Sequence, residues 1–192
     1  MDSTHPQDVS DPDLLAAVAG SDAAAFERLY QLYEKRVYQY VCTLIYDPSL
    51  AEEVVVDAMM AVWRGAGSFS RSSRVSTWIF GIARHKALDA LRRAGRHHHD
   101  VALDEALELP NAQESPVESV NRKQVTSLTQ QALRALSQEH QEVLRLVFFE
   151  ELPYEEIAIL LSIPTNTVKT RVYYAKQRLK QQLKELGQGE RV

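Results

Sequence analysis

Hydrophobic residues in the first half of the chain recur at steps of three and four, the period of an α-helix that buries one face. The clearest stripe consists of Phe26, Leu29, Tyr33, Val37, Val41 and Leu44. Proline, glycine and small polar residues interrupt the pattern and divide it into four helices. We expect caps at Asp11, at Ser21-Asp22, at Ser49 and at Ser76 or Thr77, with the last two helices covering about 50–66 and 78–93. The sequence therefore predicts a helical bundle over residues 11–95.

The second half returns to the same period. Its first stripe is Val125, Leu128, Ala132 and Leu136, and a helix capped by Ser137 follows with Val143, Leu144, Val147 and Phe148 on its apolar side. A short helix then carries Ile157, Ala158 and Leu161, with Ile163 in the turn and Pro164 as a breaker. A second helix, capped by Thr165 or Asn166, has an inner stripe of Val168, Val172, Ala175, Leu179 and Leu183. Two short-linked helices of this kind predict a helix-turn-helix, whose second helix enters the DNA major groove.

Helical periodicity fails between these halves, where Pro110 and Pro116 stand among acidic residues. We expect a linker there, with one short helical turn around 103–107. The fold class is therefore all-α, with two small helical domains joined by an acidic linker. The expected divisions are a loose tail at 1–10, domains at 11–95 and 121–186, a linker at 96–120 and a tail at 187–192.

The charge distribution indicates two nucleic-acid surfaces, although the net charge is −4. Residues 71–96 are mainly basic, residues 169–184 contain no acid, and residues 100–118 contain no base. Two basic blocks on separate bodies can each neutralise phosphates. The exposed face of the second helix is the place where Lys and Arg could contact base edges.

Several other functions lack the residues they require. The polar, acidic start is no signal peptide, and no apolar stretch is long enough to cross a bilayer, so we expect a cytoplasmic protein without membrane insertion. Cys42 is predicted to be a buried thiol. His97, His98 and His99 favour a solvated helix end over a metal site. The sequence contains no recognisable catalytic group, phosphate-binding glycine loop or cofactor site, so neither an enzyme nor a cofactor is expected.

Two segments resemble bacterial extracytoplasmic-function sigma factors of the sigma-70 family. Residues 51–64, Phe69 and residues 76–89 resemble domain 2 of these factors, whereas 135–148 and 154–179 resemble domain 4. The resemblance runs in the right order from about Asp13 to Leu186. It implies an alternative sigma factor that binds core RNA polymerase and directs initiation at −35 and −10 promoter elements.

The resemblance also implies partners and residue roles. The clamp helices of the largest polymerase subunit would be bound by Glu52, Glu53, Asp57 and Trp63. The flap of the second subunit and an anti-sigma protein are further expected partners. The family usually has Gln where this chain has Val56, which changes the polymerase-facing surface. Phosphorylation near that surface is a further hypothesis, with candidate hydroxyls at Thr43, Ser49 and Ser68.

The implied −10 contacts are Phe69, Arg71, Arg74, Trp78, His85, Lys86, Arg92 and Arg93. A base extruded from the duplex needs a stacking pocket, which aromatic residues of this loop can supply. Trp78 fits core packing equally well, and Arg92 and Arg93 fit a solvated helix end. The implied −35 contacts are Lys169, Thr170, Arg171, Tyr173, Tyr174 and Lys176. Tyr174 stands where the family often has Arg.

Two other classes remain open on the residues alone. A stand-alone helix-turn-helix regulator would bind duplex DNA as a dimer at symmetric half-sites and would need no melting loop. An enzyme with a helical core would need a metal or phosphate site, which the sequence does not indicate.

Overall fold

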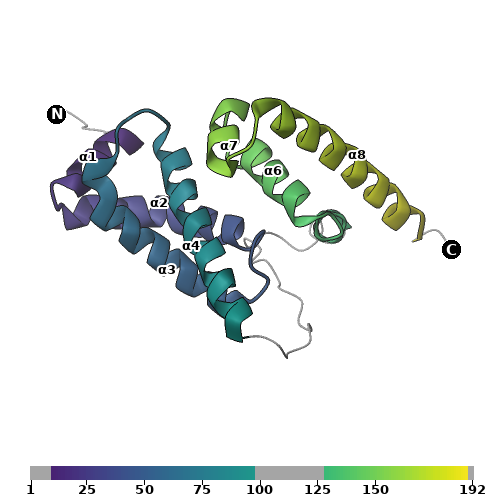
Figure 1. Ribbon diagram of the computed structural model, residues 1–192, viewed down its shortest axis with the longest axis horizontal. Helices are drawn as coiled ribbons and strands as arrows, with labels where there is room; N and C mark the ends of the chain where they lie inside the picture. Colours follow the sequence, from purple (N-terminus) through teal and green to yellow (C-terminus); the bar gives the residue numbers. More distant parts are fainter. Residues whose placement is uncertain (1–9, 98–127, 190–192) are drawn as a thin grey trace, which may run out of the picture. The chain divides into compact units, whose positions relative to one another are not determined.

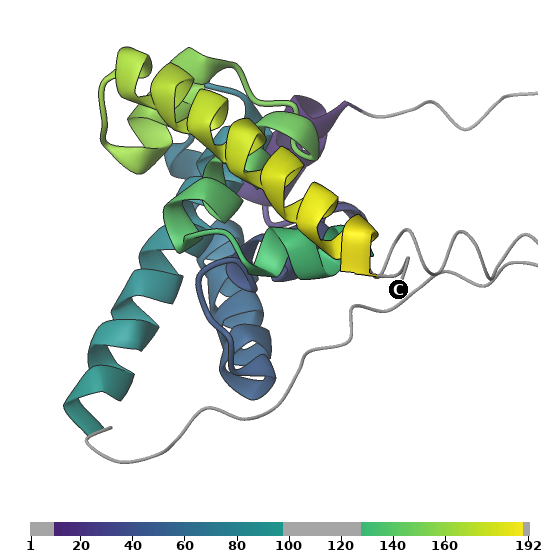
Figure 2. The same cartoon turned by 90° about the vertical axis from the view of Figure 1, so that its right-hand side faces the viewer.

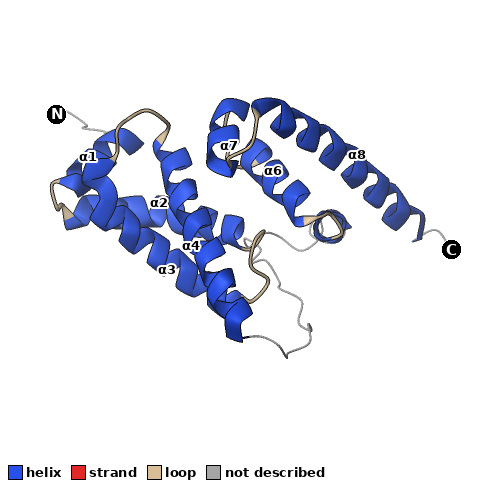
Figure 3. Cartoon of the chain, viewed as in Figure 1, coloured by secondary structure: helices blue, strands red, loops and turns tan. Residues whose placement is uncertain are grey.

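A computed structural model describes residues 10–97 and 128–189, and within those ranges the secondary structure is helical without any strand (Figure 3). The chain divides into two compact units, residues 1–99 and 100–192, which are described separately. The all-α fold expected from the sequence is confirmed. Val125, His98, His99, residues 98–120 of the expected linker and the helical turn expected at 103–107 lie outside the described residues, whereas residues 96 and 97 belong to α4.

The first unit is a bundle in which α3 packs against both α2 and α4, and α1 packs against α2 (Figure 1). Its elements are α1 (Asp11–Ala19), α2 (Ala23–Val41), α3 (Pro48–Gly65), the 3-10 turn η1 (Ala66–Ser68) and α4 (Val75–His97). The expected stripe forms the core, with Leu29, Tyr33, Val37 and Val41 fully buried. Phe26, at the start of that stripe, is only half-buried.

Tyr33 joins α1 to α2 through its hydroxyl group, which donates a hydrogen bond to Asp11. The Arg36 guanidinium lies 4.7 Å from the centre of the Tyr33 ring. Burial raises the pKa of Tyr33 above its usual range, and the hydrogen bond to Asp11 raises it further. The phenol is therefore a neutral donor at physiological pH, as this bond requires.

Two helix caps differ from expectation by one or two residues. Ser10, not Asp11, is the N-cap of α1, and Asp11 is the first helical residue. Asp47, not Ser49, caps α3, and its carboxylate accepts hydrogen bonds from the amides of Ser49 at 2.9 Å and Leu50 at 3.2 Å. Pro48 lacks an amide hydrogen and has a fixed φ, so it fits the first helical position directly after Asp47. The helix therefore begins before Ser49 can act as its cap.

The fourth helix is longer than the expected 78–93. Its first hydrogen bond runs from the Trp78 amide to the Arg74 carbonyl at 3.1 Å, so Ser76 and Thr77 lie inside the first turn instead of capping it. At the other end α4 continues through Gly95 to His97. Among the described residues no glycine has a positive φ, and Gly95 therefore does not form the left-handed turn that ends many helices.

Cys42 is less buried than the sequence predicted. Cys42 directly follows the end of α2, and its side chain is partly exposed, whereas the sequence predicted a buried thiol.

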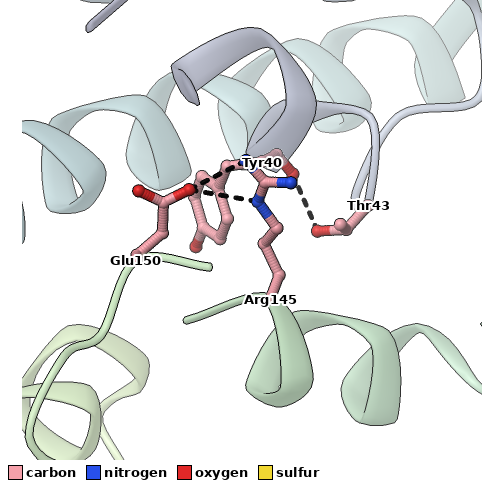
Figure 4. Close-up of polar contacts among 4 residues, drawn as sticks. All are labelled: Tyr40, Thr43, Arg145 and Glu150. Carbon is pink, nitrogen blue, oxygen red and sulfur yellow. Dashed lines mark hydrogen bonds and ion pairs between the residues drawn. The ribbon is translucent and has the colours of Figure 1, made fainter. Parts of the chain in front are cut away.

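Two hydroxyl groups bond to carbonyls at helix ends. The Thr43 hydroxyl donates to the Tyr40 carbonyl at 2.7 Å (Figure 4). The Ser68 hydroxyl donates similarly to the Gly65 carbonyl at 2.7 Å. Two of the three hydroxyls considered for phosphorylation thus help to end helices.

In the second unit, α6 and α7 pack against one side of α8 (Figures 1 and 2). Residues 128–134 are helical and are followed by α6 (Gln138–Phe148), α7 (Tyr154–Leu161) and α8 (Thr165–Gly189). The core contains Ala132, Val143, Leu146, Ile157, Val168 and Ala175. Ser137 is the N-cap of α6 as expected, although its side chain makes no capping hydrogen bond.

An ion pair spans the turn between α6 and α7. Arg145 donates from Nη2 to Glu150 Oε1 at 2.9 Å and from Nε to the same oxygen at 3.1 Å (Figure 4). The Arg145 guanidinium also lies 4.8 Å from the centre of the Phe149 ring. Two hydrogen bonds to one carboxylate oxygen restrain this turn, which leads directly into the helix-turn-helix.

The cap assignment at α3 can be tested with a matched pair of substitutions. Asp47→Ala leaves two amides of the first turn without their acceptor, so we expect the free energy of unfolding to fall by about 1 kcal/mol. Ser49→Ala should change it by less than about 0.5 kcal/mol. Urea unfolding followed by circular dichroism measures both. A larger loss for Ser49→Ala than for Asp47→Ala would show that the cap is assigned wrongly.

Candidate nucleic-acid interface

The turn between α7 and α8 brings two helices into a helix-turn-helix. Ser162 ends α7 in the left-handed conformation with a φ of 56°, and the Ile163 amide donates to the Ala158 carbonyl at 3.0 Å. The Pro164 carbonyl then accepts from the amides of Thr167 and Val168 at 2.8 and 3.2 Å. Helix α8 therefore begins at Thr165, and the expected cap at Thr165 or Asn166 is wrong by at least one residue. Proline can occupy this position because the amide hydrogen that it lacks has no partner inside the helix.

Helix α8 buries one face and exposes the other. Val168, Val172 and Ala175 are buried, as expected, whereas Leu179 is half-buried and Leu183 is exposed. The exposed side at the start of the helix presents Lys169, Thr170, Tyr173 and Tyr174. These are four of the six residues expected to contact the −35 element, and the structure brings them onto one surface.

The polar groups on this surface differ in their freedom to reach DNA. The Thr170 hydroxyl donates to the Asn166 carbonyl at 2.9 Å, which leaves its oxygen as an acceptor. The rings of Tyr173 and Tyr174 meet edge to face, with 5.4 Å between their centres. Each tyrosine therefore restrains its neighbour, and both remain more than half exposed.

The other two expected −35 residues lie on the flanks of α8. Arg171 Nη2 lies 3.1 Å from Oε2 of Glu139 on α6. Lys176 Nζ lies 4.8 Å from the centre of the Phe148 ring, in the range of a cation–π contact. Both cations thus have partners within the second unit. Sequence reasoning missed Glu139, because its partner is 32 residues further along the chain (171 minus 139).

An apolar groove lies beside Lys176 in the second unit. Its volume is about 590 Å³, and its apolar lining consists of Leu133, Leu144, Phe148, Phe149, Leu179 and Leu183. Phe148 was expected on the apolar side of its helix, yet it is 51% exposed, and Phe149 is 60% exposed. Leu146 fills the core position instead. Two adjacent exposed phenylalanines are a larger apolar surface than scattered single residues, and they favour a protein partner.

In the first unit, Phe69 in the segment between η1 and α4 packs on Trp78 in the first turn of α4. The rings of Phe69 and Trp78 are tilted, with 5.5 Å between their centres, and both side chains are half-buried. A Cβ atom at Gly65 would lie 3.5 Å from the Trp78 ring, so the end of α3 lies close to this indole. Trp78 therefore combines packing with partial exposure. Arg71 and Arg74 are exposed on the same segment.

The basic residues further along α4 include a small ion-pair network. Asp89 Oδ2 lies 3.2 Å from His85 Nδ1, and Asp89 Oδ1 accepts a hydrogen bond from Arg92. This bond from Arg92 lowers the pKa of Asp89, and the charge of His85 when protonated lowers it further. His85, Arg92 and Arg93 are exposed, and Lys86 is half-buried. Asp89 therefore lies among the residues expected to contact the −10 element and carries a negative charge at neutral pH.

The surface of α3 expected to face the polymerase is a mixture of acidic and apolar residues. Glu52 and Glu53 are exposed, and Asp57 is half-buried. Val56 is 53% exposed and Met60, one turn later, is 38% exposed. Trp63 packs edge to face on Phe26, with 5.0 Å between ring centres, so part of this indole belongs to the contact between α2 and α3. The sequence did not single out Met60.

The described residues contain no cluster of three or more His, Cys, Asp or Glu side chains arranged to hold a metal ion. Among the helices in that part of the chain, none is both long and apolar enough to cross a membrane.

Comparison with known proteins identifies both units. The family described as "Sigma-70 region 2" matches residues 29–97, and "Sigma-70, region 4" matches residues 127–179. The RNA polymerase sigma-H factor of Pseudomonas aeruginosa is 28% identical over 183 residues, which cover 92% of this chain and 95% of that protein. The ECF RNA polymerase sigma factor SigL of Mycobacterium tuberculosis is 30% identical over 176 residues, covering 90% and 97% respectively.

Two solved structures extend the comparison. One is the sigma factor RpoE in complex with the anti-sigma factor NepR from Bartonella quintana, with a TM-score of 0.68, 25% identity, and coverage of 83% of this chain and 96% of that one. The other is CnrH in complex with the cytosolic domain of CnrY, with a TM-score of 0.62, 21% identity, and coverage of 91% and 97%. The second likeness concerns the fold alone.

The packing of Phe69 on Trp78 can be measured by fluorescence. The chain has two tryptophans, so a Trp63→Phe background leaves Trp78 as the reporter. In that background we expect Phe69→Ala to shift the emission to longer wavelength, because the indole loses an apolar neighbour and gains contact with water. Ser70→Ala, on the same loop, is the matched control and should leave the emission unchanged. Equal spectra for Phe69→Ala and its parent would contradict the contact.

Proposed function

Because the chain belongs to the extracytoplasmic-function sigma factors of the sigma-70 family, which direct RNA polymerase to specific promoters, we propose that it reads two separate promoter elements with its two units. The observation that carries this proposal is the surface of α8, where basic and aromatic side chains gather opposite a buried stripe. RNA synthesis itself belongs to the polymerase, and this chain contributes binding and positioning.

The −35 element is bound by the start of α8. Lys169 neutralises a phosphate or bonds a guanine edge, and Thr170 offers its hydroxyl oxygen to a base or phosphate. The exposed rings of Tyr173 and Tyr174 contact base edges and thymine methyl groups. The free amides at the start of α8 favour a phosphate close to Thr165.

The −10 element is bound by the segment from Phe69 to Trp78 and by the basic side of α4. Extruding a base from the duplex costs a few kcal/mol, which stacking on an aromatic ring offsets. Phe69 and Trp78 lie in contact and are both partly exposed, and this supports a base-binding role for the pair. Arg71, Arg74 and Arg93 are exposed and would hold the phosphates of the separated strand.

The polymerase is bound through both units. In the first unit, Glu52, Glu53 and Asp57 face the clamp helices of the largest subunit, with Val56 and Met60 as an apolar centre. In the second unit, the apolar groove with Phe148 and Phe149 accepts the flap of the second subunit, and Lys176 at its rim favours a partner with nearby acidic residues. An apolar centre with charges around it is the usual composition of a protein interface.

We place the polymerase-binding and −10 domain at residues 11–95 and the −35 domain at 121–186, joined by the acidic linker at 96–120.

An anti-sigma protein is the regulator that we expect, in keeping with the RpoE relative, which is bound to the anti-sigma factor NepR. The protein then acts in the cytoplasm, where the polymerase is found.

The decisive experiment is transcription in vitro with core RNA polymerase on a pool of promoter fragments from the host. We expect defined start sites that appear only when this chain is added, each preceded by two conserved elements. Symmetric half-sites bound by the chain alone, without new start sites, would favour a stand-alone dimeric regulator instead. Fragments lacking either element serve as controls.

The apolar centre on α3 gives a second prediction. Val56→Glu places a charge where we propose an apolar contact, so we expect the affinity for core polymerase to fall at least about tenfold, or about 1.4 kcal/mol. Fluorescence anisotropy of the labelled chain measures this affinity. Leu32→Glu is the matched control, because Leu32 is exposed to a similar extent, 51%, but lies on α2. Equal affinities for Val56→Glu and the unaltered chain would exclude Val56 from the interface.

A further inference from the structure

Arg171 differs from the other polar residues at the start of α8, because its side chain turns toward α6. It follows the buried Val168 by three residues and precedes the buried Ala175 by four, which places it on the flank of the buried stripe. Its guanidinium lies 3.1 Å from the carboxylate of Glu139, in the first turn of α6. The Arg171 side chain is 25% exposed and that of Glu139 is 65% exposed. This ion pair therefore joins two different helices of the second unit.

We propose that Glu139 is a positioning residue that holds Arg171 on the protein, so that the −35 element is read by Lys169, Tyr173 and Tyr174 without Arg171. The inference rests on the proposed function of α8. A free arginine binds guanine edges and phosphates through paired N–H groups. A guanidinium that is paired with a carboxylate has fewer N–H groups to offer, and this one is also directed toward α6, away from the exposed face of the helix.

Removing the carboxylate of Glu139 should therefore change which DNA sequences are bound. Glu139→Gln keeps the size of the side chain and removes the charge that holds Arg171. The released guanidinium gains access to phosphates and guanines beside the start of α8. We expect tighter binding to DNA that lacks the −35 element, and a plot of log affinity against log salt that is steeper by about one unit.

The experiment uses the full chain bound to core polymerase and a pool of promoter fragments randomised over the −35 element. Fragments retained by the complex are sequenced, and the preference for each base is compared with that of the unaltered chain. We expect Glu139→Gln to reduce the preference at one or more positions by about tenfold, in the range of a single bidentate contact to a base. Glu155→Gln is the matched control, because Glu155 is an exposed acid in the first turn of α7. It changes the charge equally and should leave the base preferences unchanged.

A double substitution separates positioning from general electrostatics. In an Arg171→Gln background, Glu139→Gln should have no further effect on base preference, because the side chain that it releases is gone. The inference would be overturned if Glu139→Gln left the base preferences unchanged. It would also be overturned if Glu139→Gln changed them equally in the unaltered chain and in the Arg171→Gln background. An Arg171→Gln chain that loses its −35 preference while Glu139→Gln retains it would overturn it too, because Arg171 would then read the DNA directly.

Two further outcomes are distinguishable. If Glu139 served only to stabilise the start of α6, Glu139→Gln would lower Tm and weaken binding to all fragments equally, and the inference would be wrong. If the unaltered complex showed no base preference over the −35 element while still initiating transcription, the proposed role of α8 would be wrong, and the inference would be overturned with it.

Discussion

The burial of one face of α8 is the constraint on which the DNA-binding surface depends. Val168 and Ala175 have no exposed surface, and α6 and α7 cover that side of the helix. Successive residues of a helix are separated by about 100° around its axis, so a shift by one residue would turn Lys169 or Tyr173 toward the core. The packing of the stripe therefore determines which side chains face solvent, and with them the surface that a major groove can meet.

The same arrangement occurs in the first unit, where α4 carries the other candidate interface. Small residues on its inner side, Ala83, Ala87 and Ala90, are buried and allow close approach of neighbouring helices, while His85 and Arg92 face solvent. The loop that precedes α4 is restrained by the packing of Phe69 on Trp78. Each unit thus supports a polar surface by means of a helix whose opposite face is core.

Periodicity predicted the helices and most core residues, because a stripe such as Leu29, Tyr33 and Val37 reports directly on which face is buried. Periodicity was less informative at helix ends, where two neighbouring residues can each act as the N-cap. Asp47 and Ser49 are both good caps, and only the backbone before Pro48 decides between them. Contacts between distant residues could not be predicted at all. The pairing of Arg171 with Glu139 and the exposure of Phe148 depend on how α6 packs against α8.

Acidic residues beside both candidate DNA surfaces suggest how affinity and selectivity are balanced. Asp89 pairs with His85 and Arg92 on α4, and Glu139 pairs with Arg171 beside α8. With a net charge of −4, the chain as a whole does not attract DNA phosphates, and these pairs reduce the local attraction at its two basic surfaces. A sigma factor reaches the promoter as part of its complex with the polymerase. Once one part of that complex is bound to DNA, the sigma factor meets its own DNA element at a high effective concentration, so weak non-specific binding is sufficient. In the proposed arrangement, selectivity then depends on the few side chains at the start of α8 that are proposed to meet the bases.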